Sequence, residues 1–302
     1  MAVHVLPAGL GVEELAERLA PLGHVRVAGA RTERITLLDT FDWRLHRAGV
    51  RLDAAGGPPP HLRLRPLQGG RPLAAARTGG VPRWIRDLPP GTLRERLAPL
   101  VEPRALLPLA TGSVTVTRLE LTVSGRAQPL VLSHEAALVA APGAEPCLPL
   151  RPALVTPDTA QAAPLRALAA AWPDVEPAPA DTVAALLEPL GRAPRDYSGK
   201  VRVPLDPAAP ARDAARALLL HLLGTLEANL PGVRADTDPE FLHDVRVAVR
   251  RTRSALGQLK GVLPPATAAR FAAAFAGLQE LTGPARDLDV YVLELPALGR
   301  LL

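Results

Sequence analysis

One short segment of the chain concentrates the side chains best suited to bind a ligand. A histidine and three arginines recur there at spacings of three and four residues: His243, Arg246, Arg250 and Arg253. Successive residues of an α-helix lie about 100° apart, so this spacing puts the four side chains along one side of a helix. Like charges in such a row repel each other by roughly 0.2–0.5 kcal/mol per pair, so the row needs a negative partner alongside. We therefore expect this side of the helix to bind a repeating polyanion.

A second side of the same predicted helix is mostly apolar. Its residues share the three-and-four spacing and lie roughly 120° around from the cationic row: Val245, Val249, Thr252, Leu256 and Leu259. One side can then pack while its neighbour presents cations. Arg251 falls on neither side, and Lys260 extends the cationic row by nearly two more turns. The alternative is a solvated basic face, or one neutralised by internal carboxylates.

Arginine supplies almost all of the positive charge. The formal net charge is +5, and Lys200 and Lys260 are the only lysines. Arginine stays charged and binds phosphate in a bidentate manner, which favours phosphate partners. A GC-rich genome would also produce abundant Arg, Ala, Pro and Gly, so the positions of the arginines carry more information than their number.

Cysteine content and hydropathy exclude several classes of protein. Cys147 is the only cysteine, so no intrachain disulfide forms, and nothing resembles a Cys/His zinc spacing. No apolar stretch reaches the roughly 20 residues needed to cross a bilayer, and no leader peptide opens the chain. We expect a cytoplasmic protein without a membrane partner, a bound metal or a cofactor.

The first two thirds of the chain are typical of an antiparallel α+β domain. Three segments alternate with the period of a strand: His61–Arg65, Ser113–Val123 and Leu130–Val139. Glu13–Leu22 and Thr182–Leu190 have helical spacing instead. At 302 residues two domains are expected, and we place the first at residues 1–203.

Residues 207–302 form the second predicted domain, an all-α antiparallel bundle. Proline and glycine divide it into four helices, with breaks at Pro231-Gly232, Pro264-Pro265 and Gly283-Pro284. Asp238 is the predicted N-cap of the basic helix, and Pro239 its first residue. Short connections between amphipathic helices favour antiparallel neighbours.

Two motifs of the helical part resemble those of the CHAD domain. The first comprises His243, Arg246-Val247, Arg250-Arg251 and Arg253, and the second runs from Arg286 to Val290 as Arg-Asp-Leu-Asp-Val. Members of this family are α-helical and bind inorganic polyphosphate through basic side chains. The resemblance covers residues 207–302 and implies a site at His243, Arg246, Arg250, Arg251, Arg253, Lys260 and Arg286.

The resemblance also leaves some roles and the assembly open. We interpret Asp287 and Asp289 as ion-pair partners that hold the arginines of the basic helix, rather than as metal ligands. Arg216 and His221 of the preceding helix are weaker candidates for the same groove. A full family domain has two similar helical halves, and this sequence matches one. A missing segment or a second subunit would complete the bundle, which leaves a homo-oligomer as one option.

The first domain resembles the CYTH, or triphosphate tunnel, family. Leu37–Val50, with its Asp-Thr and Ala-Gly, is similar to a family segment, and His61–Arg65 corresponds to a basic strand. The stretch from Leu190-Gly191 to Ser198-Gly199-Lys200 is similar to the closing motif. The resemblance covers residues 1–203 and implies an antiparallel β tunnel or barrel-like domain with flanking helices.

This first domain departs from the active members of that family. They open with Glu-x-Glu-x-Lys, whose acids help to bind a divalent metal, whereas the first strand here is Met1–Leu6 and no acid precedes Glu13. Leu148–Val155 replaces a further acidic strand. Without clustered carboxylates Mg²⁺ or Mn²⁺ lacks ligands, so we expect no catalytic residue and no enzyme. A secondary anion site at Arg63, Arg65, Arg118 and Lys200 competes with the alternative that these side chains pair with acids such as Glu120.

The sequence thus predicts non-catalytic binding of inorganic polyphosphate, with association with polyphosphate granules in the cytoplasm as one option. One alternative is a triphosphate-hydrolysing or cyclase enzyme of the tunnel family with an altered metal site. Another is binding to nucleic-acid backbones. Aromatic residues make up only 3% of the chain, so few side chains can stack on bases, which disfavours this last alternative.

Overall fold

The computed structural model describes residues 2–57, 59–125, 128–156 and 162–299, and it divides into two compact units. Unit 1 comprises Met1–Val101 and Leu106–Asp196, and unit 2 comprises Glu102–Ala105 and Tyr197–Leu302. Unit 2 thus begins at Tyr197, before the boundary predicted at residues 203–207, and it also includes the four residues Glu102–Ala105 from within the predicted first domain. These four join it because Arg104 and the Ala105 amide bond to Asp238.

Unit 1 contains a ten-stranded antiparallel sheet with the order β10-β1-β9-β7-β6-β2-β3-β4-β5, in which β8 pairs with β7. The strands are β1 Ala2–Val5, β2 His24–Asp39, β3 Val50–Ala55, β4 His61–Pro66, β5 Ala74–Arg77, β6 Leu107–Thr122, β7 Leu130–Ala140, β8 Leu148–Pro149, β9 Ala153–Thr156 and β10 Glu176–Pro177. Among the described strands β10 and β5 form two unjoined edges, so the sheet is tunnel-like and not closed. The predicted antiparallel tunnel-like domain is confirmed.

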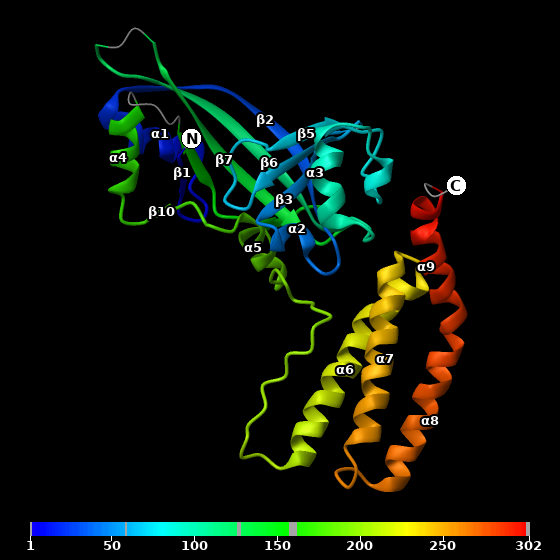
Figure 1. Ribbon diagram of the computed structural model, residues 1–302. Helices are drawn as coiled ribbons and strands as arrows, with labels where there is room; N and C mark the ends of the chain where they lie inside the picture. The colour runs from blue at the N-terminus through cyan, green and yellow to red at the C-terminus, as the bar shows by residue number, and fades with distance from the viewer. Residues whose placement is uncertain (1, 58, 126–127, 157–161, 300–302) are drawn as a thin grey trace. The chain divides into compact units, whose positions relative to one another are not determined.

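Short helices cover the sheet of unit 1. They are α1 Val12–Leu19, α2 Arg44–Arg47, α3 Thr92–Val101, α4 Ala163–Ala170 and α5 Thr182–Leu187, with 3-10 turns at Ala20–Leu22, Ile85–Asp87 and Glu188–Leu190. α1 and α4 lie at one end of the sheet and α3 near the other (Figure 1). On β4 the buried Leu62 and Leu64 pack in the cluster that includes α3, so period-two alternation turns Arg63 and Arg65 to the opposite face.

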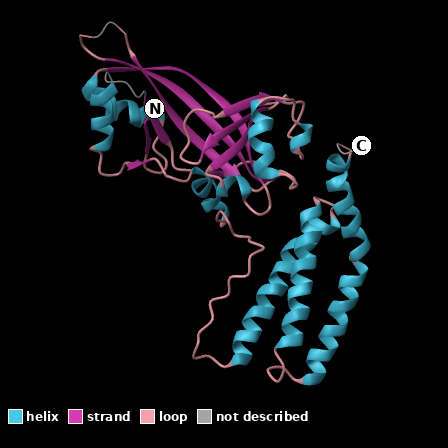
Figure 2. Cartoon of the chain, viewed as in Figure 1, coloured by secondary structure: helices cyan, strands magenta, loops and turns pink. Residues whose placement is uncertain are grey.

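Unit 2 is helical, as predicted (Figure 2). Its helices are α6 Ala211–Arg234, α7 Pro239–Gln258, α8 Pro265–Leu281 and α9 Gly283–Leu298. The Asp238 carboxylate accepts hydrogen bonds from the Glu240 and Phe241 amides, which confirms the predicted N-cap. No helix among the described residues is both long and apolar enough to cross a membrane.

The predicted break at Pro231-Gly232 is wrong, because α6 continues to Arg234. Pro231 has no backbone N–H, so one helical hydrogen bond is missing near the end of α6, but the helix continues past it. Gly232 is buried against the Phe241 ring, where an added Cβ would lie 2.2 Å from Cδ1. The glycine is therefore required for close packing of α6 on α7.

α7 packs against both α6 and α8. The predicted apolar side of α7 is buried at Val245, Val249, Thr252 and Leu256. Leu226 of α6 and Phe275 of α8 pack on the cluster formed with Val245 and Val249. The cationic row lies roughly 120° around α7 from this packed side.

Candidate anion-binding site

Arg246 and Arg253 lean from α7 toward the C-terminal end of α8. Arg246 Nη1 donates to the Gln279 backbone oxygen and to Thr282 Oγ1, each at 2.9 Å. Arg253 Nη1 donates to Gln279 Oε1 at 2.5 Å. Both guanidinium groups are thus held by neutral oxygens, which orient the groups without cancelling their charge.

Arg250 and Arg251 lie next to a second feature, a hollow of about 340 Å³ that Ser254 also lines. Arg251 Nη1 donates to the Gly199 backbone oxygen at 3.0 Å, which fixes one side of the hollow. Arg250 is exposed and His243 half-buried. The structure therefore separates the arginines of this segment into two that contact α8, Arg246 and Arg253, and two beside this hollow, Arg250 of the row and Arg251.

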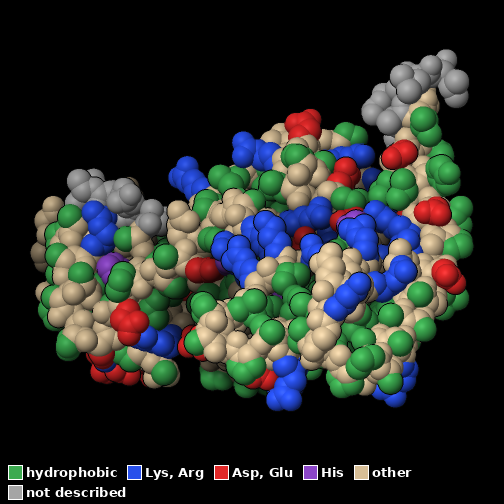
Figure 3. Space-filling model, turned by 60° about the horizontal axis from the view of Figure 1, so that its bottom comes forward, with side chains coloured by type: hydrophobic (Ala, Val, Ile, Leu, Met, Phe, Trp, Pro, Cys, Tyr) green, Lys and Arg blue, Asp and Glu red, His purple; other side chains and the backbone are tan. Residues whose placement is uncertain are grey.

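These cations share one electrostatic property. Among the described residues no carboxylate lies within 4.0 Å of the charged nitrogens of His243, Arg246, Arg250, Arg251 or Arg253. Figure 3 shows Lys and Arg side chains gathered in groups with few acidic side chains among them. The alternative that internal carboxylates neutralise the row is therefore wrong for these five residues. The positive charge of the four arginines remains available to an external anion.

A buried network explains why the acid inside the motif does not neutralise its neighbours. Asp244 lies within the cationic segment, yet its Oδ2 accepts from Arg104 Nη2 at 2.6 Å and from the Tyr197 hydroxyl at 3.0 Å. Asn229 Nδ2 donates to the Tyr197 hydroxyl at 2.7 Å. Burial, followed by the nearby Asp244 charge, raises the pKa of Tyr197, so the hydroxyl stays protonated and donates. The Asp244 carboxylate therefore bonds to Arg104 and Tyr197 within unit 2 and not to the arginines of α7.

Arg104 anchors this network and was not predicted. Its side chain is 2% exposed, and Nη1 donates to Asp238 Oδ1 at 3.2 Å while Nη2 reaches Asp244. Asp238 Oδ2 also accepts from the Ala105 amide at 3.0 Å. Arg104 is 140 residues from Asp244 in the chain, so no local pattern points to this pairing.

The second motif does not act as predicted. Neither Asp287 nor Asp289 forms an ion pair within the described part of the chain. Arg286 Nη2 lies 3.9 Å from Glu240 Oε1, and its Nη1 donates to the Pro239 backbone oxygen at 3.2 Å. Burial raises the pKa of Asp289, although Arg286 opposes this shift. Arg286 therefore contacts the N-terminal end of α7 and is partly neutralised there.

The remaining candidates of the helical part lie apart from the main group. Lys260 is exposed just beyond the end of α7. Arg216 lines a different groove, together with Thr252 and Leu256 from the packed side of α7. It therefore does not add to the cationic row. The prediction that it would do so is wrong, because the groove that Arg216 lines is formed with the packed side of α7 and not with the side that carries the row.

The four candidates predicted for a secondary site are not brought together as free cations. Arg63 Nη1 lies 3.1 Å from Glu33 Oε2, and Arg65 Nε lies 3.6 Å from Asp53 Oδ2. An ion pair of 3.4 Å joins exposed Arg118 to an oxygen of Glu120. Lys200 belongs to unit 2. The three arginines therefore pair with acidic side chains, which is the alternative given under the sequence analysis.

The inner face of the unit 1 sheet carries charged residues that the sequence analysis missed. Arg51 lies opposite Arg65 in the β3–β4 register, and it donates to Asp53 Oδ2 at 3.0 Å and to Thr182 Oγ1 at 2.8 Å. Burial raises the pKa of Glu135, against the effect of Arg65, Arg51 and Arg31. The alternation Arg51-Leu52-Asp53 was the signal that could have revealed this face.

This charge arrangement does not suit a divalent cation. Among the described residues, His, Cys, Asp and Glu side chains form no group of three that could hold a metal ion. Glu33 and Asp53 are already paired with arginines, and arginine charges also surround Glu135. A hard cation would need several free carboxylate oxygens and would be repelled by these guanidinium groups. The residues present therefore do not fit a Mg²⁺ or Mn²⁺ site.

A buried carboxyl lies at the turn between β2 and α2. Asp39 accepts three backbone hydrogen bonds, from Thr40 at 2.7 Å and from Leu45 and His46 at 2.9 Å each. Burial nevertheless raises the pKa of Asp39 to about 6. His46 Nε2 lies 2.6 Å from Asp181 Oδ2, at the N-terminus of α5. These bonds hold together the segment that resembles the tunnel family.

Comparison with known proteins adds one specific result. No curated protein matches the chain. A solved structure described as a putative adenylate cyclase from Bacillus halodurans is similar at 13% identity and a TM-score of 0.33, over 55% of this chain and 87% of that one. Residues 217–301 match the family model of the CHAD domain. The part of the chain formed by most of α6 and by α7, α8 and α9 is therefore a CHAD domain.

Proposed function

We propose that this protein binds inorganic polyphosphate on the cationic side of α7 and does not hydrolyse it. The observation that carries the proposal is that His243 and four arginines of α7 have no carboxylate partner among the described residues. The CHAD domain at residues 217–301 supports a phosphate polymer as the ligand. Association with polyphosphate granules would follow from the same binding.

The geometry of α7 matches a linear polyanion. His243 and Arg253 are ten residues apart, which corresponds to roughly 15 Å along a helix. Several phosphate groups of one polymer can therefore contact the row at once. Hydrogen bonds to neutral oxygens hold the guanidinium groups of Arg246 and Arg253 in place before the polymer binds. This reduces the conformational entropy lost on association.

We propose the absence of catalysis because of the side chains that unit 1 could offer to a metal ion. Its inner carboxylates face arginines, so they are poor ligands for the metal that phosphoryl transfer requires. We expect no release of phosphate from tripolyphosphate in the presence of Mg²⁺ or Mn²⁺. Phosphate release that a unit 1 variant such as Glu135→Gln abolishes would replace binding by catalysis as the function.

The decisive experiment reverses two charges of α7. Arg250→Glu/Arg253→Glu should abolish retention of long-chain polyphosphate, because two attractive contacts become repulsive. The matched control is Arg234→Glu/Arg270→Glu, which makes the same change of net charge at exposed residues outside the row. Titration calorimetry measures affinity, and circular dichroism verifies that both variants fold. Equal loss in both would indicate a nonspecific charge effect and contradict the assigned site.

Competition separates polyphosphate from nucleic acid. At fixed ionic strength, long-chain polyphosphate should displace single-stranded DNA, whereas DNA should displace polyphosphate poorly. A titration with polyphosphates of graded length should show affinity rising until the polymer spans the row. Preferential binding of DNA would support the nucleic-acid alternative instead.

A further inference from the structure

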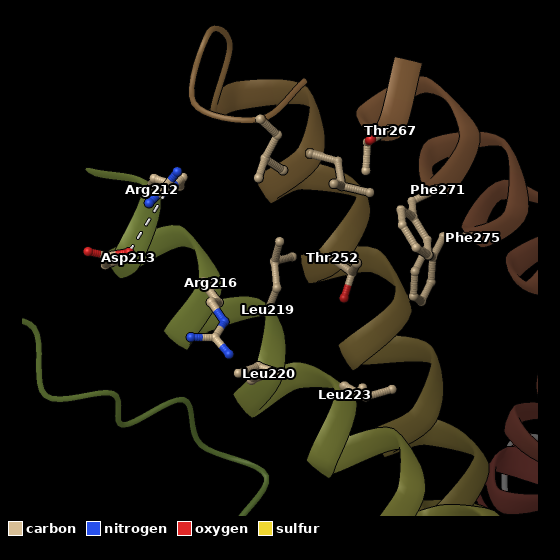
Figure 4. Close-up of a pocket in the computed structure, with 12 residues that line it drawn as sticks. Arg212, Asp213, Arg216, Leu219, Leu220, Leu223, Thr252, Thr267, Phe271 and Phe275 are labelled. Atoms are coloured by element: carbon tan, nitrogen blue, oxygen red, sulfur yellow. Dashed lines mark ion pairs between the residues drawn. The ribbon is translucent and has the colours of Figure 1, made fainter. Parts of the chain in front are cut away.

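An apolar groove runs between α6 and α8, on the packed side of α7. Its volume is about 570 Å³. Leu220 and Leu223 of α6 and Phe271 and Phe275 of α8 form the walls (Figure 4), and Leu256 of α7 also lines the groove. Leu220 is 54% exposed, Leu223 45% and Phe271 41%. Contiguous uncovered apolar side chains of this kind mark binding surfaces in soluble proteins.

One end of the groove is cationic. Arg212 and Arg216 lie one turn apart on α6 and line the groove together with Asp213, so these three side chains leave that end with a net charge of +1. Arg212 has only a weak contact with the adjacent Asp213, at 3.9 Å, and Arg216 has no ion pair among the described residues. Two guanidinium groups at this spacing can bind one carboxylate between them.

The same end also receives two helix N-termini. α6 and α8 run in the same direction, because α7 reverses the chain between them. Arg212 and Thr267 come from the first turns of α6 and α8, and both line the groove. Neither helix has a side-chain N-cap, and the positive ends of two helix dipoles favour an anion there, although Asp213 already places one carboxylate in the first turn of α6.

We propose that this groove binds a monomeric fatty acid with an alkyl chain of the length of dodecanoate. The carboxylate lies at Arg212 and Arg216, and the alkyl chain extends along Leu220 and Leu223 toward Phe275. The volume lies within the roughly 300–1,000 Å³ of small-molecule sites, which are mostly apolar with a few polar groups that fix orientation. Polyphosphate has no apolar part, so it gains nothing from these walls.

This site is separate from the proposed polyphosphate site. Thr252 lines the groove, and it lies about 180° around α7 from His243. Arg253, the member of the row nearest to Thr252, lies about 100° from it around α7, so a fatty acid and a polyphosphate contact different sides of the helix. Either proposal can fail while the other stands.

The test is titration calorimetry of the full chain with dodecanoate below its critical micelle concentration. We expect one bound molecule per chain, with hexanoate at least roughly a hundredfold weaker because six methylene groups are lost from the groove. Dodecyltrimethylammonium has the same chain and the opposite charge, and it should not bind. Equal binding of the cation, or the absence of dodecanoate binding, would overturn the proposal.

Two pairs of variants locate the ligand. Arg212→Gln/Arg216→Gln should weaken dodecanoate about tenfold and leave polyphosphate binding unchanged, whereas Arg234→Gln is the matched control outside the groove. Leu220→Ser/Leu223→Ser should weaken dodecanoate binding further. Leu230→Ser, at an exposed position of the same helix, is the control and should leave it unchanged. Unchanged affinity for dodecanoate in both groove variants would contradict the proposed site. Binding to anionic vesicles without binding to monomeric dodecanoate would show a membrane surface instead, and would equally overturn it.

Discussion

The charge of an arginine and the geometry of its hydrogen bonds are separable at Arg246. Its Nη1 contacts two neutral oxygens, those of Gln279 and Thr282, so the group is oriented but remains cationic. An ammonium group carries the same charge without the planar fork. Orientation at constant charge can therefore be tested at this one position.

Arg246→Lys should lower polyphosphate affinity about three- to tenfold, because lysine cannot keep both contacts and still present two donors to phosphate. Calorimetric titration with long-chain polyphosphate measures the change. Arg270→Lys, at an exposed position of α8, should leave affinity unchanged. Wild-type affinity in Arg246→Lys would mean that charge alone matters at this position.

Gly232 is the residue most sensitive to added volume. Gly232→Ala should reduce the free energy of unfolding of unit 2 by about 1–3 kcal/mol, because its Cβ would overlap the Phe241 ring. Gly257→Ala is the control, since a Cβ there meets no atom within 4 Å and α7 gains up to about 1 kcal/mol of helix propensity. Urea denaturation followed by circular dichroism compares the two. A neutral Gly232→Ala would show that the helices separate readily.

At the scale of elements, the loop that carries Arg104 holds α7 in place. Arg104→Leu should destabilise unit 2 by about 3–5 kcal/mol, because Asp238 and Asp244 would remain buried without their cation. Arg96→Leu, at an exposed residue of α3, should cost little. Chemical denaturation measures both variants. A cost for Arg104→Leu close to that of Arg96→Leu would mean that water or rearrangement replaces the buried pair.

The β2–α2 turn gives a prediction for pH. The folded pKa of Asp39 is about 6 and its unfolded value 3.8, so its contribution to stability is full below pH 4 and is lost as the pH rises through 6. The loss amounts to about 3 kcal/mol. A carboxyl-carbon NMR titration should give an Asp39 midpoint near 6. A midpoint near 4 would mean that the three backbone donors outweigh burial.

At the scale of the whole molecule, net charge does not tell where an anion binds. Both units carry several arginines, yet those on the inner face of unit 1 pair with Glu33 and Asp53. The arginines of the α7 row contact neutral oxygens or lie exposed. Two arginine clusters that look alike in the sequence therefore differ in available charge.

The sequence by itself determined the elements and their two-sided character. Period-two alternation predicted β4, β6 and β7, the Asp238-Pro239 pair predicted the start of α7, and the three-and-four spacing predicted its cationic and packed sides. These features depend on residues within a few positions of each other. Local backbone geometry therefore suffices to derive them.

Only the tertiary structure decided which charges are neutralised and where α6 and α8 leave a groove. Arg104 meets Asp244 across 140 residues, and Arg63 meets Glu33 across 30. Such pairs depend on how strands and helices come together, which no local spacing encodes. The same holds for Arg216, which lines the groove because of the direction in which its helix packs. An ionised side chain binds an external anion only if folding has not already given it an internal partner.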